Sequence, residues 1–447
     1  MGVKKLKAGE VFAILLGAII GWGSFMLPGT KFLHTSGVIN TSIGIFLGTM
    51  CIVLIERSYR FMMQQDINEG GEFSYVVMFL GKKHGFVVGW FLFLAYLSLV
   101  PLNATAFPLV INKWSPGLLD FGYLYTIAGD SVYLGEVLVS ALIVLFFTYL
   151  NLKGTKQSGS VQFFIVLALI LCVILVTAGM LMTADMDAFY QNYVADNGWD
   201  FAQIAPVIAI TPFLFIGFDA IPQLVKDMNL SRKRASVMAV TALLIGMSCY
   251  ILLNFSTALA LGPKEAYQQD WALGYGVLEH LGKAGFLLLV IALGSAVSGG
   301  INGFMICAVK LIGAMGREDV LPHALSKTDE RGASKNAIWF VSIVGIAACF
   351  FGREVVNWVV DMCSFGASVT YFYVCFTTFL KADARRIRIE AALGALLSIC
   401  FALLLVIPVS PAALSVPARI FLGIWVVLGV VLFVRLFRLE QPGKKSR

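Results

Sequence analysis

Apolar residues lie in long runs along this chain, and short polar stretches separate the runs. Each run is about 20 residues long, which is the length that an α-helix needs to cross a hydrocarbon core of ~30 Å. The longest polar segments, residues 184–202 and 313–335, are expected to be loops. The pattern predicts an all-α membrane protein of about twelve transmembrane helices, at residues 11–33, 37–60, 86–111, 133–151, 160–182, 204–226, 236–260, 284–312, 336–351, 355–380, 388–408 and 418–437.

The composition agrees with this interpretation and excludes several classes of protein. Of 447 residues, 59% are hydrophobic and 13% are charged, against about 25% charged in soluble proteins. So few charges could not keep so much apolar surface in solution. No cluster of His, Cys and carboxylate lies in the predicted spans, so we do not expect an enzyme. The eight cysteines lie in predicted spans without a CxxC pair, so we expect no metal site, disulfide framework or cofactor.

Lys and Arg residues are distributed unequally between the predicted loops. If the N-terminus is cytoplasmic and the twelve helices alternate in direction, most of the 33 Lys and Arg residues fall on the cytoplasmic side. Such an excess in short loops orients the spans during insertion. We therefore expect a multi-pass protein of the cell inner (plasma) membrane with both termini cytoplasmic. The net charge of +7 reflects this topology and does not indicate a nucleic-acid partner. The exceptions are Lys31, Lys113, Lys264, Lys283, Arg353 and Arg419.

Two predicted helices contain matching interruptions. Helix 1 has Gly23 and Pro28, and helix 6 has Gly217 and Pro222, at the same spacing. Glycine destabilises a helix and proline removes a backbone donor, so both segments can unwind. The alternative is ordinary packing of small residues between membrane helices. The two helices open two blocks of five, residues 11–182 and 204–380, and such pairs are typical of inverted-repeat transporters. Residues 388–437 would form two further helices. Residues 1–10 and 438–447 would be the two cytoplasmic ends of the chain.

Unwound segments provide a chemically specific site in a membrane. Freed N–H and C=O groups need a partner or must line a wet cavity, because hydrocarbon offers none. The N-terminal ends of half-helices carry partial positive charge and hold anionic groups, whereas freed carbonyls hold cations. A zwitterion with one carboxylate and one ammonium suits this arrangement. The pattern therefore favours a site for a zwitterion at the midplane.

Several motifs in the correct order resemble those of the amino acid–polyamine–organocation (APC) transporters. Residues 17–29 resemble the family's helix 1 signature, and residues 213–219 resemble its FxFIGFD motif in helix 6. Residues 70–75 with Gly89 and Trp90, residues 151–154, and residues 298–322 extend the resemblance, which covers about residues 8–390. It implies alternating access and the five-plus-five inverted-repeat (LeuT-type) fold, with discontinuous helices 1 and 6 and with helices 11 and 12 outside the repeat.

The resemblance also implies roles for residues at the two breaks. Backbone amides near Gly21, Trp22 and Gly23 would receive a substrate carboxylate. Phe215 and Phe218 would be aromatic gates or cavity walls, or else pack against lipid or the core. The carbonyls that would receive an amino group are those of Ile20, Phe213, Leu214 and Ile216.

This chain departs from the family pattern at three positions. Trp22 replaces a small residue, and Ser24 replaces the Ile that follows it in the motif. Trp22 could shrink the pocket, place its indole over a cationic head group, or face a neighbouring helix. Proton-coupled relatives often carry a Lys in helix 5, where this chain has Leu169. Proton coupling through that lysine is therefore not expected.

Polar residues inside predicted spans are candidates for function by default. Asp219 follows the helix 6 break and could hold an ammonium, carry a proton or cap freed N–H groups, and the resemblance favours capping. Asp361 and Ser364 are weaker candidates in helix 10. Ser295 and Ser298 could bind Na⁺ or merely bond to backbone, so coupling to Na⁺ or H⁺ stays open. The candidate substrate site comprises Ile20, Gly21, Trp22, Gly23, Ser24, Asn103, Phe213, Leu214, Phe215, Ile216, Gly217, Phe218, Asp219 and Asn302.

Together these features predict a secondary active transporter, either a permease or an exchanger, for a small amino acid. The first alternative is a permease for an organic amine, polyamine or quaternary ammonium compound, which Trp22 and Asp219 would suit. An alternative of another class is a non-transporting nutrient sensor or membrane scaffold, although the tail after residue 440 is short for a regulatory domain. The expected partners are a small-molecule substrate and the lipid bilayer, and the sequence leaves the oligomeric state open.

Overall fold

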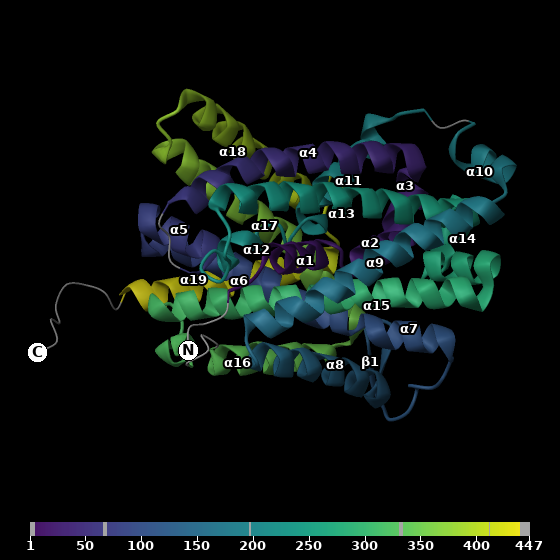
Figure 1. The fold of residues 1–447 in the computed structure, drawn as a ribbon, viewed down its shortest axis with the longest axis horizontal. Coiled ribbons are helices and arrows are strands. Elements are labelled where there is room, and N and C mark those ends of the chain that lie inside the picture. Colours follow the sequence, from purple (N-terminus) through teal and green to yellow (C-terminus); the bar gives the residue numbers. More distant parts are fainter. Residues whose placement is uncertain (1–4, 66–68, 196–197, 330–333, 411, 439–447) are drawn as a thin grey trace, which may run out of the picture.

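The computed structural model describes residues 5–65, 69–195, 198–329, 334–410 and 412–438. Long helices run side by side along the long axis of the molecule (Figure 1). In chain order the elements are α1 (Ala8–Ile19), α2 (Gly23–Leu27), the π-helical turn η1 (Pro28–Phe32), α3 (Leu33–Thr35), α4 (Gly37–Gln64), α5 (Gly71–Leu80), α6 (Lys82–Ala104), α7 (Ala106–Trp114), β1 (Tyr123–Ile127), β2 (Asp130–Tyr133), α8 (Leu134–Leu152), α9 (Thr155–Thr183), α10 (Met186–Tyr193), α11 (Phe201–Leu214), α12 (Ala220–Leu224), α13 (Arg232–Ala260), α14 (Pro263–Gln268), α15 (Ala272–Arg317), the 3₁₀ turn η2 (His323–Ser326), α16 (Lys335–Cys349), α17 (Gly352–Lys381), α18 (Arg385–Val406) and α19 (Val416–Arg438).

Within the described residues, ten helical segments are long and apolar enough to cross a membrane. The predicted span 204–226 is not among them because it is divided into α11 and α12, and neither piece reaches the necessary length. The predicted span 336–351 corresponds to the 15-residue helix α16. The other ten predicted spans each correspond to one of the long segments. The structure therefore establishes a multi-pass helical protein, and the count of twelve stays a prediction.

Helix α1 lies at the centre of the bundle, in contact with α9, α13 and α15. Helix α15 also packs against α6, and α17 packs against α4, α6 and α18. Apolar side chains that point away from this core are exposed, among them Leu142 (65%), Phe164 (70%) and Ile343 (62%). A wide exposed apolar surface is what a protein needs in order to face lipid.

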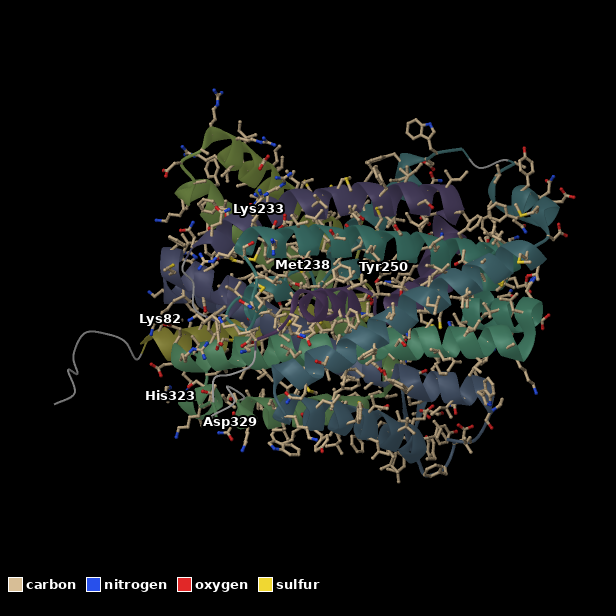
Figure 2. All side chains as sticks on the ribbon, in the orientation of Figure 1. Lys82, Lys233, Met238, Tyr250, His323 and Asp329 are labelled. Carbon is tan, nitrogen blue, oxygen red and sulfur yellow. The ribbon has the colours of Figure 1, made fainter. Side chains whose placement is uncertain are left out.

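Charged side chains gather at one end of the bundle. Lys82, Lys233, His323 and Asp329 all lie at this end (Figure 2), and α19 also ends there (Figure 1). We refer to it as the lysine-rich end. The hairpin of β1 and β2 lies at the opposite end with α7, α10 and α14. Helix α7 contains Lys113 and α14 contains Lys264, two of the basic residues that were not expected on the cytoplasmic side. The two ends thus differ as the charge pattern predicts, and their orientation relative to the cytoplasm stays a prediction.

The β-hairpin and the short helix α10 were not expected from the sequence. Strands β1 and β2 pair antiparallel around Ala128 and Gly129, which both have positive φ, 54° and 90°. Such a two-residue turn matches the twist of the strands. Helix α10 lies in a segment that was expected to be a loop. Its Tyr193 hydroxyl donates to the Leu261 carbonyl at 2.7 Å, and burial raises the pKa of Tyr193, which keeps it a donor.

Candidate functional site

The first break lies between α1 and α2. Helix α1 ends at Ile19, and Ile20 has an extended backbone with φ −94° and ψ 90°. The helix restarts at Gly23, where the Ser24 N–H donates to the Gly21 carbonyl at 3.3 Å and the Phe25 N–H donates to the Trp22 carbonyl at 3.1 Å. Residues 20–22 are therefore outside regular helix, as expected for a discontinuous helix 1. Pro28 begins the π-helical turn instead of marking the break.

The second break lies between α11 and α12 and touches the first. Gly217 has φ of +122°, which side chains rarely tolerate. A Cβ atom at this position would lie 2.7 Å from the Ala18 Cβ and 2.9 Å from the Ile19 nitrogen. Only glycine therefore allows the helix 6 break to approach α1 this closely. The close approach brings the two interrupted segments together in one region.

Asp219 is fully engaged by donors of the protein itself. One carboxylate oxygen accepts the Gly217 N–H at 2.6 Å, and the other accepts the Tyr96 hydroxyl at 2.8 Å. The residue is 1% exposed. Of the three roles considered from the sequence, these contacts match the capping of freed backbone N–H groups.

Asn103 occupies the first break from α6. Its Oδ1 accepts the Trp22 N–H at 3.2 Å, and its Nδ2 donates to the Leu99 carbonyl at 2.7 Å. The side chain fits between Gly21 and Gly300, where a Cβ atom would lie 3.1 Å and 2.7 Å from the carboxamide. The Trp22 amide, which the resemblance assigns to a substrate carboxylate, therefore already donates to a protein oxygen.

A cavity of about 980 Å³ leads from the hairpin end to the breaks. Trp22 and Phe213 line it, together with residues of α7, the hairpin, α14 and α17. Charged groups in its wall include five carboxylates and three cations: Asp130, Glu136, Asp270, Glu354, Asp361, Lys31, Lys113 and Arg353. Lys31 and Asp361 form an ion pair across it at 3.3 Å. The cavity is therefore wide, polar and acidic.

Trp22 lies against a cation of the chain itself. The Arg353 guanidinium carbon is 4.7 Å from the centre of the indole ring, within the range of a cation–π contact. One guanidinium nitrogen donates to the Thr105 carbonyl at 2.6 Å. The other has no hydrogen-bond partner within the described part of the chain, and the same is true of the Trp22 Nε1. The charge pattern predicts only that Arg353 lies outside or near the outer face. Its contact with Trp22 is not predictable from local sequence, because the two residues are far apart along the chain.

The two phenylalanines of the predicted site lie in aromatic clusters. Phe215 and Phe218 are 0% and 1% exposed. Phe215 packs edge-on against Tyr250 with ring centres 6.0 Å apart. Phe218 packs against Tyr59 at 5.0 Å and against Tyr371 at 5.6 Å. Both side chains are therefore part of the core in this state of the protein.

Asn302 and the two serines considered for an ion lie elsewhere on α15. Asn302 accepts from Asn151 at 3.1 Å and from Ser158, and donates to Gln162 at 3.1 Å. This buried network joins α8, α9 and α15 and does not line the large cavity. Ser295 and Ser298 are partly buried. Of the predicted residues, Trp22 and Phe213 line the cavity, whereas Ile20, Leu214 and Ile216 lie buried beside it.

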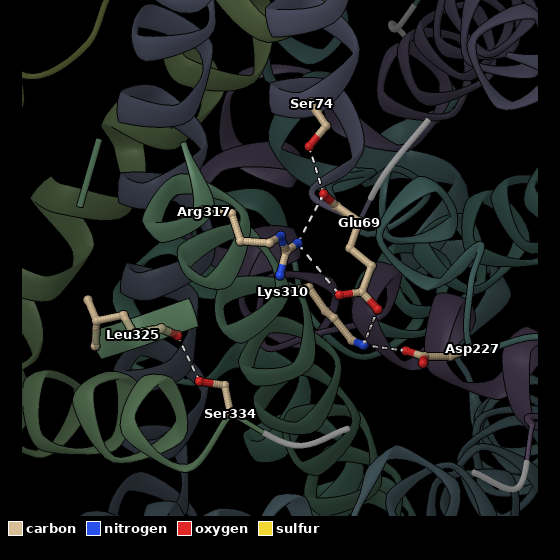
Figure 3. A network of polar contacts seen from close by, with 7 residues as sticks. All are labelled: Glu69, Ser74, Asp227, Lys310, Arg317, Leu325 and Ser334. Atoms are coloured by element: carbon tan, nitrogen blue, oxygen red, sulfur yellow. Dashed lines mark hydrogen bonds and ion pairs between the residues drawn. The ribbon is translucent and has the colours of Figure 1, made fainter. Parts of the chain in front are cut away.

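An ion-pair network closes the lysine-rich end (Figure 3). The Lys310 ammonium lies 2.7 Å from Asp227 and 3.2 Å from Glu69, and Arg317 lies 3.6 Å from Glu69. The Leu6 N–H donates to the Asp227 carbonyl at 2.8 Å. The space beside this network measures about 30 Å³, room for water molecules only. The large cavity thus reaches the first break from the hairpin end, and among the described residues this network lies toward the other end.

Comparisons with known proteins place this geometry in context. A family profile described as amino acid permease matches residues 7–433. A branched-chain amino acid permease of Lactococcus lactis is 22% identical, over 96% of this chain and 93% of the relative. An arginine/ornithine antiporter of Pseudomonas aeruginosa is 21% identical, over 76% and 69%. An aspartate–proton symporter of Bacillus subtilis is 22% identical, over 82% and 71%. The substrates named for these relatives differ, so the comparisons do not identify one substrate.

Proposed function

Because the chain belongs to the amino acid permease family, whose members are transporters and not enzymes, we propose that it carries a small amino acid across the cytoplasmic membrane by alternating access. The observation that carries this proposal is the 980 Å³ cavity that ends on two abutting helix breaks. Breaks of this kind supply the freed backbone groups that bind zwitterions in transporters.

The proposed architecture is the five-plus-five inverted repeat. Residues 11–182, from α1 to α9, form the first repeat, and residues 204–380, from α11 to α17, form the second. The broken pairs α1/α2 and α11/α12 each open one repeat. Helices α18 and α19, within residues 388–437, lie outside both repeats. With α16 and the α11/α12 pair added to the ten long segments, the chain would cross the membrane twelve times.

In the proposed orientation the lysine-rich end faces the cytoplasm, with residues 1–10 and 438–447 on that side. The excess of Lys and Arg in short loops supports it. The structure would then be an outward-open state, since the cavity opens at the hairpin end and the Lys310 network closes the other.

The proposed binding mode starts from the backbone of the two breaks. The substrate carboxylate would take the amides near Gly21 and Gly23 and displace Asn103 from the Trp22 N–H. Carbonyls of Ile20, Phe213, Leu214 and Ile216 would take the ammonium. Trp22 and Phe213 would contact the substrate side chain, because both line the cavity.

One observation favours a second candidate function, the transport of an organic amine. Carboxylates outnumber cations in the cavity wall by five to three, and such a field raises the local concentration of cationic ligands. A cationic amine without a carboxylate would not need the amides at the first break.

Uptake into proteoliposomes tests both candidates. We expect labelled small amino acids to accumulate and the corresponding decarboxylated amines to compete weakly. A Gly23→Val variant should lose uptake and remain folded, because a Cβ at Gly23 lies 3.3 Å from the Phe213 ring. Uptake of amines without amino acids would reject the main proposal in favour of the second candidate.

A further inference from the structure

Two carboxyl groups are buried together next to the helix 6 break. Glu72, in the first turn of α5, is 0% exposed, and Asp219 is 1% exposed. The two carboxyls are electrostatic neighbours. In the sequence, Glu72 is recognisable only as a member of the motif at residues 70–75. The structure shows that it lies near Asp219.

The two carboxyls differ in the donors that they receive. Asp219 accepts one hydrogen bond at each oxygen, from Gly217 and Tyr96. Glu72 accepts from the Gln223 amide at 3.1 Å through Oε2, while its Oε1 accepts no hydrogen bond of ordinary geometry among the described residues; the Tyr59 hydroxyl lies close enough to interact with this carboxyl. Hydrogen bonds to a carboxylate favour its ionised form. Asp219 is therefore the better anion, and Glu72 is the better carrier of a proton.

The groups around the pair are neutral at ordinary pH. Tyr59 on α4, Tyr96 on α6, Cys307 on α15 and Tyr371 on α17 each interact electrostatically with both carboxyls. Cys375 on α17 lies beside Tyr59. None of these five groups supplies a positive charge.

The nearest cation on α15 is engaged elsewhere. Lys310 follows Cys307 by one turn, and its ammonium is paired with Glu69 and Asp227. Two buried carboxylates without a cation between them cannot both ionise at low cost. At least one of the two therefore holds a proton in this state.

Unused hydrogen-bonding capacity surrounds the free oxygen of Glu72. Tyr59 and Tyr371 are 1% and 0% exposed, and neither hydroxyl makes a hydrogen bond of ordinary geometry within the described ranges, although that of Tyr59 interacts with Glu72. The two rings lie 6.1 Å apart, and both contact Phe218 of the helix 6 break. Unpaired polar groups at this depth are costly unless they take up a proton, an ion or water in the working cycle.

We propose that Glu72 is the proton-binding residue of this transporter, protonated on Oε1 in the state open at the hairpin end. This inference rests on the proposed transport function. Glu69 lies two residues before α5, which contains Glu72, and Asp227 lies three residues beyond α12, whose Gln223 contacts Glu72. Loss of the proton would set two anions against each other at the contact of α5 and α12. The segments that Lys310 clamps would then separate, which couples proton release to opening of the lysine-rich end.

The test uses Glu72→Gln, which copies the protonated carboxyl. At equilibrium, an imposed gradient of one pH unit drives at most about tenfold accumulation through one coupled proton. We expect the unaltered protein to show this accumulation and substrate-dependent proton entry, reported by a dye inside the vesicles. In Glu72→Gln both should be lost, and the remaining exchange of labelled for unlabelled substrate should be slower and should no longer vary with pH, because the neutral amide cannot drive opening of the lysine-rich end.

Glu56→Gln is the matched control. Glu56 is also a buried glutamate, 1% exposed, but it accepts from the Ser236 hydroxyl at 2.5 Å, and its charged neighbours among the described residues are Arg57 and Arg60. This variant should keep the pH-driven accumulation. Gradient-driven uptake that survives in Glu72→Gln, or uptake that needs Na⁺ and ignores the pH gradient, would overturn the inference.

Infrared spectroscopy separates failure of this inference from failure of the proposed function. The purified protein should show a C=O stretch of a protonated carboxyl that Glu72→Gln lacks and Glu56→Gln keeps, seen as a band in the difference between the spectra of the unaltered protein and of each variant. Absence of the band in the unaltered protein would reject proton binding even if amino acids are transported. Presence of the band with no uptake of any amino acid or amine would reject the transport proposal instead. Glu72→Asp, which keeps the carboxyl, serves if the Gln variant does not fold.

Discussion

Single residues determine how closely the two interrupted helices approach. Gly217 permits the contact with α1, Asp219 satisfies the amide that the break frees, and Asn103 satisfies the amide of Trp22. Without Asp219 or Asn103, a buried backbone N–H would stay unpaired in a membrane interior, where that is costly. The geometry of the breaks therefore depends on the side chains of Asp219 and Asn103 and on the lack of a side chain at Gly217.

Gly217→Ala tests this dependence. The new Cβ would collide with Ala18 and Ile19, and alanine would have to adopt φ of +122°. We expect a loss of about 1–3 kcal/mol of stability, visible as a lower melting temperature in detergent, together with loss of uptake. Gly294→Ala is the control, because nothing lies within 4 Å of a Cβ atom there, and it should be neutral. Equal melting curves for the two variants would contradict the proposed close approach.

Residue-scale features were only partly accessible from the sequence. Gly217 and Asp219 belong to a recognisable local motif, so their importance could be predicted. The contacts of Trp22 with Arg353 and of Glu72 with Asp219 join segments far apart along the chain. Such contacts depend on how helices pack, which local pattern does not encode. The substrate-site residues as a set therefore stay a prediction.

At the scale of elements, glycine marked the breaks better than proline did. Ile20 to Trp22 form the first break, beside Gly23, while Pro28 lies in a continuing π-helical turn. Pro222 lies within α12. Proline is tolerated where its missing N–H falls in the first turn of a helix. The long helices follow from apolar runs, whereas β1, β2 and α10 are too short to give that signal.

The ion-pair network that joins α15 to its neighbours at the lysine-rich end can be tested with Lys310→Met. The variant leaves Glu69 and Asp227 partly buried without their cation. We expect the closed end to weaken by about 3 kcal/mol, and hydrogen exchange of residues 225–229 to become faster. The exposed pair of Lys335 with Asp329 at 3.9 Å provides the control, since Lys335→Met should change protection little. Unchanged exchange in Lys310→Met would show that the network does not hold this end closed.

At the scale of the whole molecule, the structure combines an apolar surface with two unlike ends. One end carries the lysine-rich loops and the closing network, and the other carries the hairpin and the cavity mouth. The charge pattern predicts which end is which. It does not predict which end is open, because one sequence must support both states of an alternating-access cycle. That part of the picture required the structure.

Orientation in the membrane is testable with single cysteines introduced at exposed positions. Asp120→Cys lies at the hairpin end and Lys233→Cys at the lysine-rich end, in a background where Cys400 is replaced by Ser. We expect a membrane-impermeant maleimide to label the first position on intact cells and the second only after permeabilisation. The reverse pattern would invert the proposed topology.

The carboxamide of Asn103 also affects how the transporter behaves when no substrate is bound. Its Oδ1 accepts the Trp22 N–H, so the first break has no unpaired N–H there when no substrate is bound. An unloaded carrier that can bury its site is free to return across the membrane, and net movement in one direction then becomes possible. We expect Asn103→Ala to slow net efflux roughly tenfold, the cost of one unpaired buried amide, and to slow one-for-one exchange much less. We expect a transporter of this design to be capable of net movement of its substrate and not to be confined to obligatory exchange.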